Sequence, residues 1–127
     1  MWIKGFTYGW GGRRGDYRTE KAIRSQDKLY DVGINWMCLA FSVMQKAFSS
    51  TEIYFDYRNT VTDKDIVFII NRAHERGIKV CLEPVINCLD GMWRAHIQFP
   101  DSDMMGNDLY WDRWFEFYSA FLCHYAE

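Results

Sequence analysis

The sequence lacks the features that would place it in a membrane. None of its apolar runs approaches the roughly 18 residues of a membrane-spanning helix. The N-terminal segment Met1 to Gly5 also lacks the basic and then apolar pattern of a signal peptide. We therefore expect no membrane partner and a cytoplasmic location, unless a leader has been removed.

Clustered positive charge is missing as well. The formal net charge is -2, and the longest Lys/Arg block is the pair Arg13-Arg14. A chain of this kind creates no positive field to attract phosphate backbones. Nucleic acid is therefore not an expected partner.

The usual metal and nucleotide motifs are also absent. The four cysteines show no C-x-x-C spacing and the three histidines are widely scattered, so we expect free, buried thiols and no metal site. The glycines of Gly9-Trp10-Gly11-Gly12 are too irregular for a dinucleotide fingerprint, and no P-loop pattern is present. No cofactor is expected.

What the chain does have is the composition of one globular domain. It has 127 residues, of which 49% are hydrophobic and 25% charged. The aromatic fraction of 18%, with six tryptophans, is higher than core packing usually requires. Because an indole combines a wide apolar face with an N–H, this excess mildly favours a flat or amphipathic ligand.

A strand and a helix alternate three times along the chain. Strands are predicted over Ile3 to Tyr8, Ile34 to Val43 and Lys79 to Ile86, and a long loop over Met44 to Val61. Helices are predicted over Thr19 to Val32, from the capping-box pattern Thr62 to Asp65 up to Gly77, and from about Asn107 onward. Their buried stripes are Ala22, Ile23, Leu29, Tyr30 and Val32; Ile66, Val67, Ile69, Ile70 and Ala73; and Trp111, Trp114, Phe115, Tyr118, Phe121, Leu122 and Tyr125.

Repeated β/α units favour a parallel sheet in the α/β class. A (β/α)₈ TIM barrel needs roughly 250 residues, so this chain could supply only its first three β/α units. A small open sheet is the structural alternative. In a partial barrel, the inward face with Cys38, Ala40, Cys81 and Val85 would lack its opposite wall, which predicts self-association.

The third strand carries two polar residues on one face. Alternation places Cys81, Glu83, Val85 and Asn87 on the inward face, and Val80, Leu82, Pro84 and Ile86 toward the helices. Glu83 could belong to a site, or it could pair with a basic residue on another strand, and we favour the pairing because an isolated buried carboxylate is costly. Asn87 lies near the strand's C-terminal end, where ligands gather in α/β proteins.

The loop after this strand is rich in groups suited to sugars. Trp93 can stack on the C–H face of a sugar, and Arg94 and His96 can donate hydrogen bonds to its hydroxyls. The alternative is a structural loop held by a buried Trp93, with Arg94 paired to Asp90 or Asp101. We favour the binding role.

Several short motifs together carry a family resemblance over essentially the whole chain. They are Lys4-Gly5-Phe6-Thr7-Tyr8-Gly9-Trp10, Gly33-Ile34-Asn35-Trp36-Met37-Cys38, Phe55-Asp56-Tyr57, Val80-Cys81-Leu82, Pro84-Val85-Ile86-Asn87-Cys88, Asp90-Gly91, Trp93-Arg94-Ala95-His96-Ile97 and Tyr110-Trp111. With these motifs the chain resembles the N-terminal part of glycoside hydrolase family 113, the retaining β-mannanases of the large (β/α)₈ clan. Residues 1–127 would then be the N-terminal portion of one catalytic domain.

The resemblance implies a role in binding oligosaccharide or polysaccharide. It assigns sugar contacts to the loop after the third strand, at Asn87, Trp93, Arg94 and His96. Trp10, in the first motif, is included among the expected contacts, as is Glu83, although family members often have Lys at that position. The substrate would be β-1,4-mannan or a related polysaccharide.

No catalytic residue is expected within this chain. The resemblance places both catalytic carboxylates after the fourth and seventh strands, beyond Glu127. We therefore expect a longer parent to be a glycoside hydrolase and this chain alone to be inactive. Two rival functions remain: a non-catalytic sugar-binding α/β module, and a half-barrel interaction protein whose open sheet edges pair with a second chain.

Overall fold

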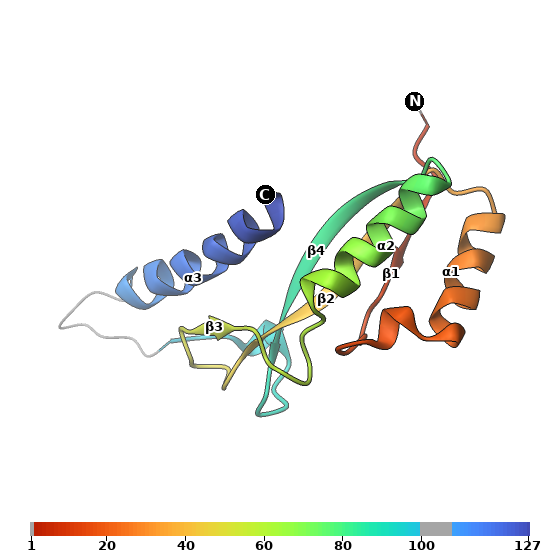
Figure 1. Ribbon diagram of the computed structural model, residues 1–127. Coiled ribbons are helices and arrows are strands. Elements are labelled where there is room, and N and C mark those ends of the chain that lie inside the picture. The colour runs from red at the N-terminus through yellow and green to blue at the C-terminus, as the bar shows by residue number, and fades with distance from the viewer. Residues whose placement is uncertain (1, 100–107) are drawn as a thin grey trace. The chain divides into compact units, whose positions relative to one another are not determined.

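The computed structural model describes residues 2–99 and 108–127, and it contains the predicted strands and helices within a few residues of their expected bounds (Figure 1). In chain order the elements are β1 (Gly5–Tyr8), η1 (Asp16–Arg18), α1 (Glu20–Asp31), β2 (Trp36–Gln45), β3 (Ile53–Tyr54), α2 (Asp63–Glu75), β4 (Lys79–Cys88), η2 (Arg94–His96) and α3 (Asp108–Ala126). They form two compact units. The first unit is Met1–Ser42 with Tyr57–Glu83, and the second is Val43–Asp56 with Pro84–Glu127.

The sheet has the predicted parallel core. β1 pairs parallel with β2, with Thr7 opposite Cys38. β4 pairs with β2 as well. The N–H of Lys79 donates to the carbonyl of Asn35 and the N–H of Leu89 to that of Gln45, so both strands run in the same direction.

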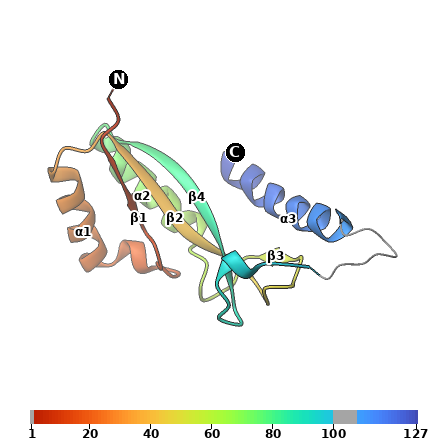
Figure 2. The same cartoon turned by 180° about the vertical axis from the view of Figure 1, so that it is seen from behind.

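Helices α1 and α2 of the first unit begin and end at the predicted signals. The Thr19 side chain accepts a hydrogen bond from the N–H of Ala22, and Thr62 and Asp65 form a complete capping box. Gly33 and Gly77 follow the two helices at φ +79° and +71°, a conformation that favours glycine at a helix end. Figure 2 shows β1 and β2 in front of α2.

The core of the first unit lies between these helices and the strands. Its fully buried side chains include Met37, Leu39, Phe41, Ile69 and Ala73. Two predicted core residues, Val32 and Val67, are instead exposed to 68% and 51%. Val32 is the C-cap of α1, where the helix ends, and Val67 turns to solvent while Ile66 and Ile69 are buried.

The predicted loop over Met44 to Val61 was wrong in part. β2 continues to Gln45, and the short strand β3 pairs antiparallel with its end, with Met44 opposite Tyr54. The pairing buries Ile53 in the second unit. Gln45 is also fully buried there, and its side chain donates to the carbonyl of Ala47 and accepts from the indole N–H of Trp114.

The aromatic stripe of α3 packs less completely than predicted. Phe121 is 7% exposed and meets Phe55 edge to face, with ring centroids 4.6 Å apart. The Tyr118 hydroxyl donates to the carbonyl of Pro84 at 3.0 Å. Phe115 and Leu122, in contrast, are 54% and 44% exposed, because they lie away from the side of α3 on which Phe121 is buried. None of the described helices has the length and apolar character needed to cross a membrane.

Candidate functional site

The loop after β4 is held in place by Asp90. One carboxylate oxygen accepts the N–H of Met92 at 2.9 Å and the other accepts the N–H of Phe48 at 3.0 Å. Gly91 has φ +81°, which allows the tight turn that follows the strand. The loop is further attached where the N–H of Gln98 donates to the carbonyl of Phe48.

Arg94 folds back onto the end of β4. Its Nε donates to the carbonyl of Ile86 at 2.9 Å, and its Nη2 donates to Oδ1 of Asn87 at 3.1 Å. We had expected a structural Arg94 to pair with Asp90, but the Asp90 oxygens serve the two backbone N–H groups. The other expected partner, Asp101, lies outside the described residues. The structure therefore joins two predicted site residues, Asn87 and Arg94, by a direct hydrogen bond.

Trp93 and His96 are exposed side chains of this loop. Trp93 is 64% exposed, which contradicts the alternative of a loop held by a buried indole. His96 is exposed, and its ring meets Trp93 edge to face at 6.1 Å between centroids. The single helical turn η2 keeps the two side chains together, because the N–H of His96 donates to the carbonyl of Trp93. An exposed indole beside an imidazole and a guanidinium suits a sugar, with its apolar C–H faces and its hydroxyls.

Glu83 is exposed in the first unit and has an unexpected neighbour. Its Oε2 accepts a hydrogen bond from the Cys38 thiol at 3.2 Å. We had favoured a basic partner on another strand, and the recorded partner is instead a thiol on β2. Burial, followed by the hydrogen bond to Glu83 and the charge of that carboxylate, raises the pKa of Cys38 to about 11.

Trp10 lies in the loop after β1, also in the first unit. It is 62% exposed, next to Gly9, whose carbonyl accepts the hydroxyl of buried Tyr17 at 2.8 Å. A Cβ on Gly12 would lie 2.2 Å from the Tyr17 ring, so the loop's glycines permit close packing on that ring. The glycine pattern that fails as a nucleotide motif therefore shapes the loop that carries Trp10.

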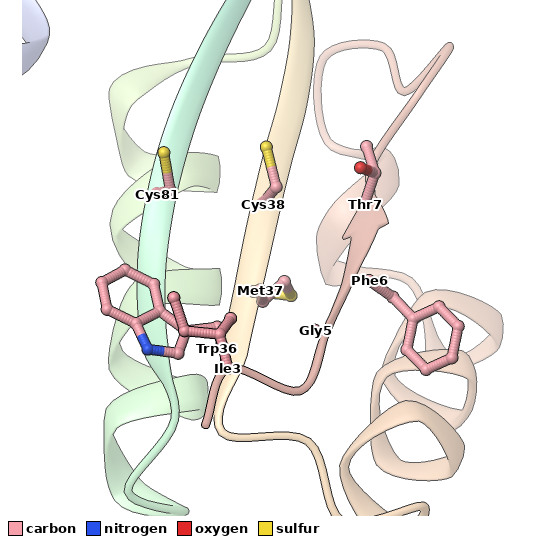
Figure 3. A pocket seen from close by; sticks show the side chains of 8 residues that line it. All are labelled: Ile3, Gly5, Phe6, Thr7, Trp36, Met37, Cys38 and Cys81. Atoms are coloured by element: carbon pink, nitrogen blue, oxygen red, sulfur yellow. The ribbon is translucent and has the colours of Figure 1, made fainter. Parts of the chain in front are cut away.

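The expectation of uniformly buried cysteines was wrong. All four cysteines are free, but Cys81 and Cys123 are exposed and Cys38 is half-buried. Cys81 lies on the face of β4 that points away from α2 (Figure 3). Cys88 is buried, and burial followed by the charge of Asp90 raises its pKa.

The second unit also contains a hollow that sequence analysis missed. It has a volume of about 440 Å³ and is lined by polar groups of one loop with two tyrosines, namely Lys46, Ser49, Ser50, Thr51, Glu52, Tyr54 and Tyr110. The only signal in the sequence was the run Ser49-Ser50-Thr51 after an apolar strand. In the described part of the chain, no group of three or more His, Cys, Asp or Glu side chains is arranged to hold a metal ion.

Comparisons with known proteins agree with this geometry. A sequence model of glycoside hydrolase family 113 matches residues 6–127. The structure is similar to a family 113 β-1,4-mannanase, with a TM-score of 0.85 and 38% identity over 98% of this chain. A family 113 β-mannanase from Alicyclobacillus acidocaldarius, solved in complex with ManMIm, gives the same TM-score, identity and coverage of this chain. No match to a curated protein was found.

The chain spans only part of these relatives. It covers 40% of the first structure and 39% of the second. The α/β sheet with its parallel strands and crossover helices is therefore a partial (β/α)₈ barrel, as the repeated units predicted.

Proposed function

Because the chain belongs to glycoside hydrolase family 113, we propose that its loop from Asn87 to His96 contacts β-1,4-mannan or a related polysaccharide in the cleft of a retaining β-mannanase. The observation that carries this proposal is the exposure of Trp93 on a loop whose backbone is anchored by Asp90 and Arg94. An anchored loop loses little conformational entropy when a ligand stacks on it.

Each side chain of the loop has a distinct part in this proposal. The indole of Trp93 stacks on the C–H face of one sugar ring, and His96 at its edge hydrogen-bonds a hydroxyl. Arg94 fixes Asn87 by donating to Oδ1, which sets the orientation of the amide relative to the strand end. Trp10 and Glu83 are proposed as additional sugar contacts from the first unit.

We further propose that this chain binds without catalysing hydrolysis. A retaining glycosidase needs two carboxyl groups about 5 to 5.5 Å apart, one as nucleophile and one as acid/base. Asp90 is committed to two backbone N–H groups, and Glu83 accepts the Cys38 thiol. Pure 127-residue protein should therefore release no reducing sugar from β-mannan. Release that Glu83→Gln abolishes would place the catalytic site here and contradict the proposal.

Calorimetric titration with a β-1,4-mannan oligosaccharide tests the binding role. Trp93→Ala should weaken binding by about 1 to 3 kcal/mol, roughly 5- to 150-fold, through loss of the stacking surface. Trp2→Ala is the matched control, because it removes another indole that is 80% exposed. Unchanged affinity in a folded Trp93→Ala protein would assign the loop a structural role only, and a β-1,4-glucan oligosaccharide run in parallel tests the preference for mannan.

We also propose that the free chain self-associates. Trp2, Ile3 and Phe6 are 80%, 63% and 57% exposed in and beside β1, which in the described part of the chain pairs only with β2. An exposed apolar strand edge favours pairing with a second copy. Sedimentation at micromolar concentration should show species larger than a monomer, and Phe6→Glu should reduce them. A monodisperse monomer with a cooperative melt would instead indicate a self-contained α/β domain.

A further inference from the structure

The hollow of the second unit lies apart from the inward face of the sheet. Its walls are the segment from Lys46 to Tyr54, which ends in β3, and the first turn of α3 at Tyr110. Figures 1 and 2 both show β3 beside α3. The end of β2 faces these walls through Gln45, whose side chain contacts α3. Because positions 38 and 45 differ by an odd number, alternation places Gln45 on the opposite face of β2 from Cys38.

Both walls of the hollow are held in place by a buried glutamine. The side chain of Gln45 donates to the carbonyl of Ala47 at 2.7 Å and accepts from the indole N–H of Trp114 at 2.9 Å, so it joins the loop to α3. A tight turn closes the loop, since the N–H of Ser50 donates to the carbonyl of Ala47 and its Oγ accepts the N–H of Ala47. The hollow is therefore formed before any ligand binds, which lowers the entropy cost of binding.

The lining of the hollow suits a neutral ligand with many hydroxyl groups. Charges of both signs are present, from Lys46 and from Glu52, which also pairs with Arg113 of α3 at 3.5 Å. A mixture of this kind disfavours a site for a simple anion or cation. The remaining described lining groups are aliphatic hydroxyls and two phenol rings, from Ser49, Ser50, Thr51, Tyr54 and Tyr110. Hydroxyls and charged groups can hydrogen-bond sugar hydroxyls, and the rings can pack on the apolar C–H faces.

The same loop is fastened to the proposed sugar loop. Phe48 lies between Lys46 and Ser49 in the sequence, and its N–H donates to Oδ2 of Asp90 at 3.0 Å. Its carbonyl accepts the N–H of Gln98 at 3.3 Å. One short segment thus forms a wall of the hollow and anchors the loop that carries Trp93. A linear polysaccharide has the shape to occupy both places at once.

We propose that this hollow is a second sugar subsite, which binds a further unit of the polysaccharide whose other units stack on Trp93. The inference rests on the proposed function of the loop from Asn87 to His96. The rings of Tyr54 and Tyr110 flank the sugar, and Lys46 donates to its hydroxyls. Because a long oligosaccharide engages both subsites while a disaccharide engages only the one at Trp93, affinity rises with chain length.

Calorimetric titration of the chain with a β-1,4-mannan disaccharide and hexasaccharide tests this dependence. The wild type should bind the hexasaccharide more tightly. Tyr54→Ala and Lys46→Met should each weaken hexasaccharide binding by about five- to tenfold and leave disaccharide binding unchanged. Lys64→Met is the matched control, because it replaces an exposed lysine of α2 that does not line the hollow. Equal affinity of the wild type for both ligands, or unchanged hexasaccharide binding in both folded variants, would overturn the proposal.

Amide NMR signals of the wild-type protein give a second measurement that does not depend on how the variants fold. The signals of Ser49, Ser50 and Thr51 should shift and saturate with the hexasaccharide. Saturable shifts with inorganic phosphate, and none with the sugar, would identify an anion site and overturn the proposal. Trp93→Ala separates this inference from the proposed function. Unchanged binding of both sugars in that variant would contradict the role of the Trp93 loop, whereas Tyr54→Ala and the three amide signals decide the role of the hollow.

Discussion

Each of the two units is organised around one aspartate, and the two aspartates act in different ways. Asp65 in the first unit is fully buried and accepts hydrogen bonds from Gly15 and Thr62 as well as an ion pair from Arg18 at 2.7 Å. Asp90 in the second unit is exposed and accepts two backbone N–H groups. Both aspartates join segments that are distant in the sequence, but Asp65 does so through a buried ion pair and Asp90 through exposed backbone hydrogen bonds that shape the loop after β4.

This difference concerns how the buried framework and the loop proposed to bind sugar are each stabilised. Asp65 of the first unit is buried, so its carboxylate oxygens need hydrogen-bond donors from the protein itself. In the second unit, the backbone of the loop is satisfied by Asp90 and Arg94, which leaves Trp93 and His96 exposed to solvent. The exposed side chains that we propose as sugar contacts are therefore not needed to satisfy buried polar groups of the first unit.

The largest expected effect is on the first unit. Asp65→Ala should lower the free energy of unfolding by about 2 to 4 kcal/mol, because it removes the capping box and leaves buried donors without an acceptor. Urea unfolding followed by circular dichroism measures this change. Glu20→Ala is the control, because the Glu20 side chain is 91% exposed and its pairing with Arg24 should be worth under about 0.5 kcal/mol. Equal effects of the two substitutions would show that Asp65 is not a structural centre.

Acid should lower the free energy of unfolding by part of the amount expected for Asp65→Ala. Burial acts to raise the pKa of Asp65, but the hydrogen bonds from Thr62, Gly15 and Arg18 outweigh it and lower the pKa below its usual 3.8. The unfolded chain therefore binds the proton first, so the stabilisation is present above about pH 4 and is lost as the pH falls through the folded-state pKa. Unfolding midpoints measured between about pH 6 and pH 2 should fall more steeply in the wild type than in Asp65→Asn. Parallel curves would contradict this assignment.

A smaller change is expected in the second unit. Asp90→Ala removes two hydrogen bonds at an exposed position and should lower stability by about 0.5 to 1.5 kcal/mol. Hydrogen exchange should quicken at the Met92 and Phe48 amides, while the amides of α2 keep their protection. If protection fell throughout both units, the aspartates would not act on separate parts of the molecule.

Local signals predicted much of this organisation, and non-local contacts explain the rest. The pattern Thr62 to Asp65 predicted the start of α2, because a capping box involves only four adjacent residues. The same Asp65 also binds Gly15 and Arg18, some fifty residues earlier in the chain, which no local pattern encodes. The strand β3 was missed for a similar reason, because it has only two residues and is defined by its pairing with β2.

The candidate site shows the same limit. Alternation along β4 predicted the less buried face with Glu83 and Asn87, because side-chain direction follows from strand geometry. Charge suggested Asp90 or Asp101 as the partner of a structural Arg94, and Asp101 lies outside the described residues. The structure also gives Arg94 the carbonyl of Ile86 and the amide oxygen of Asn87, acceptors that become available where a strand ends and that charge does not predict.

The most direct test of the separation between framework and binding loop is an NMR titration that observes the six tryptophan indole N–H signals. On addition of a β-1,4-mannan oligosaccharide, the Trp93 signal should shift and saturate, and Trp10 should shift if it is also a contact. The Trp2, Trp36 and Trp114 signals should stay in place, because these rings are not part of the proposed contact surface. A stationary Trp93 signal with saturable shifts at Trp36 or Trp114 would contradict the account and move binding away from the loop.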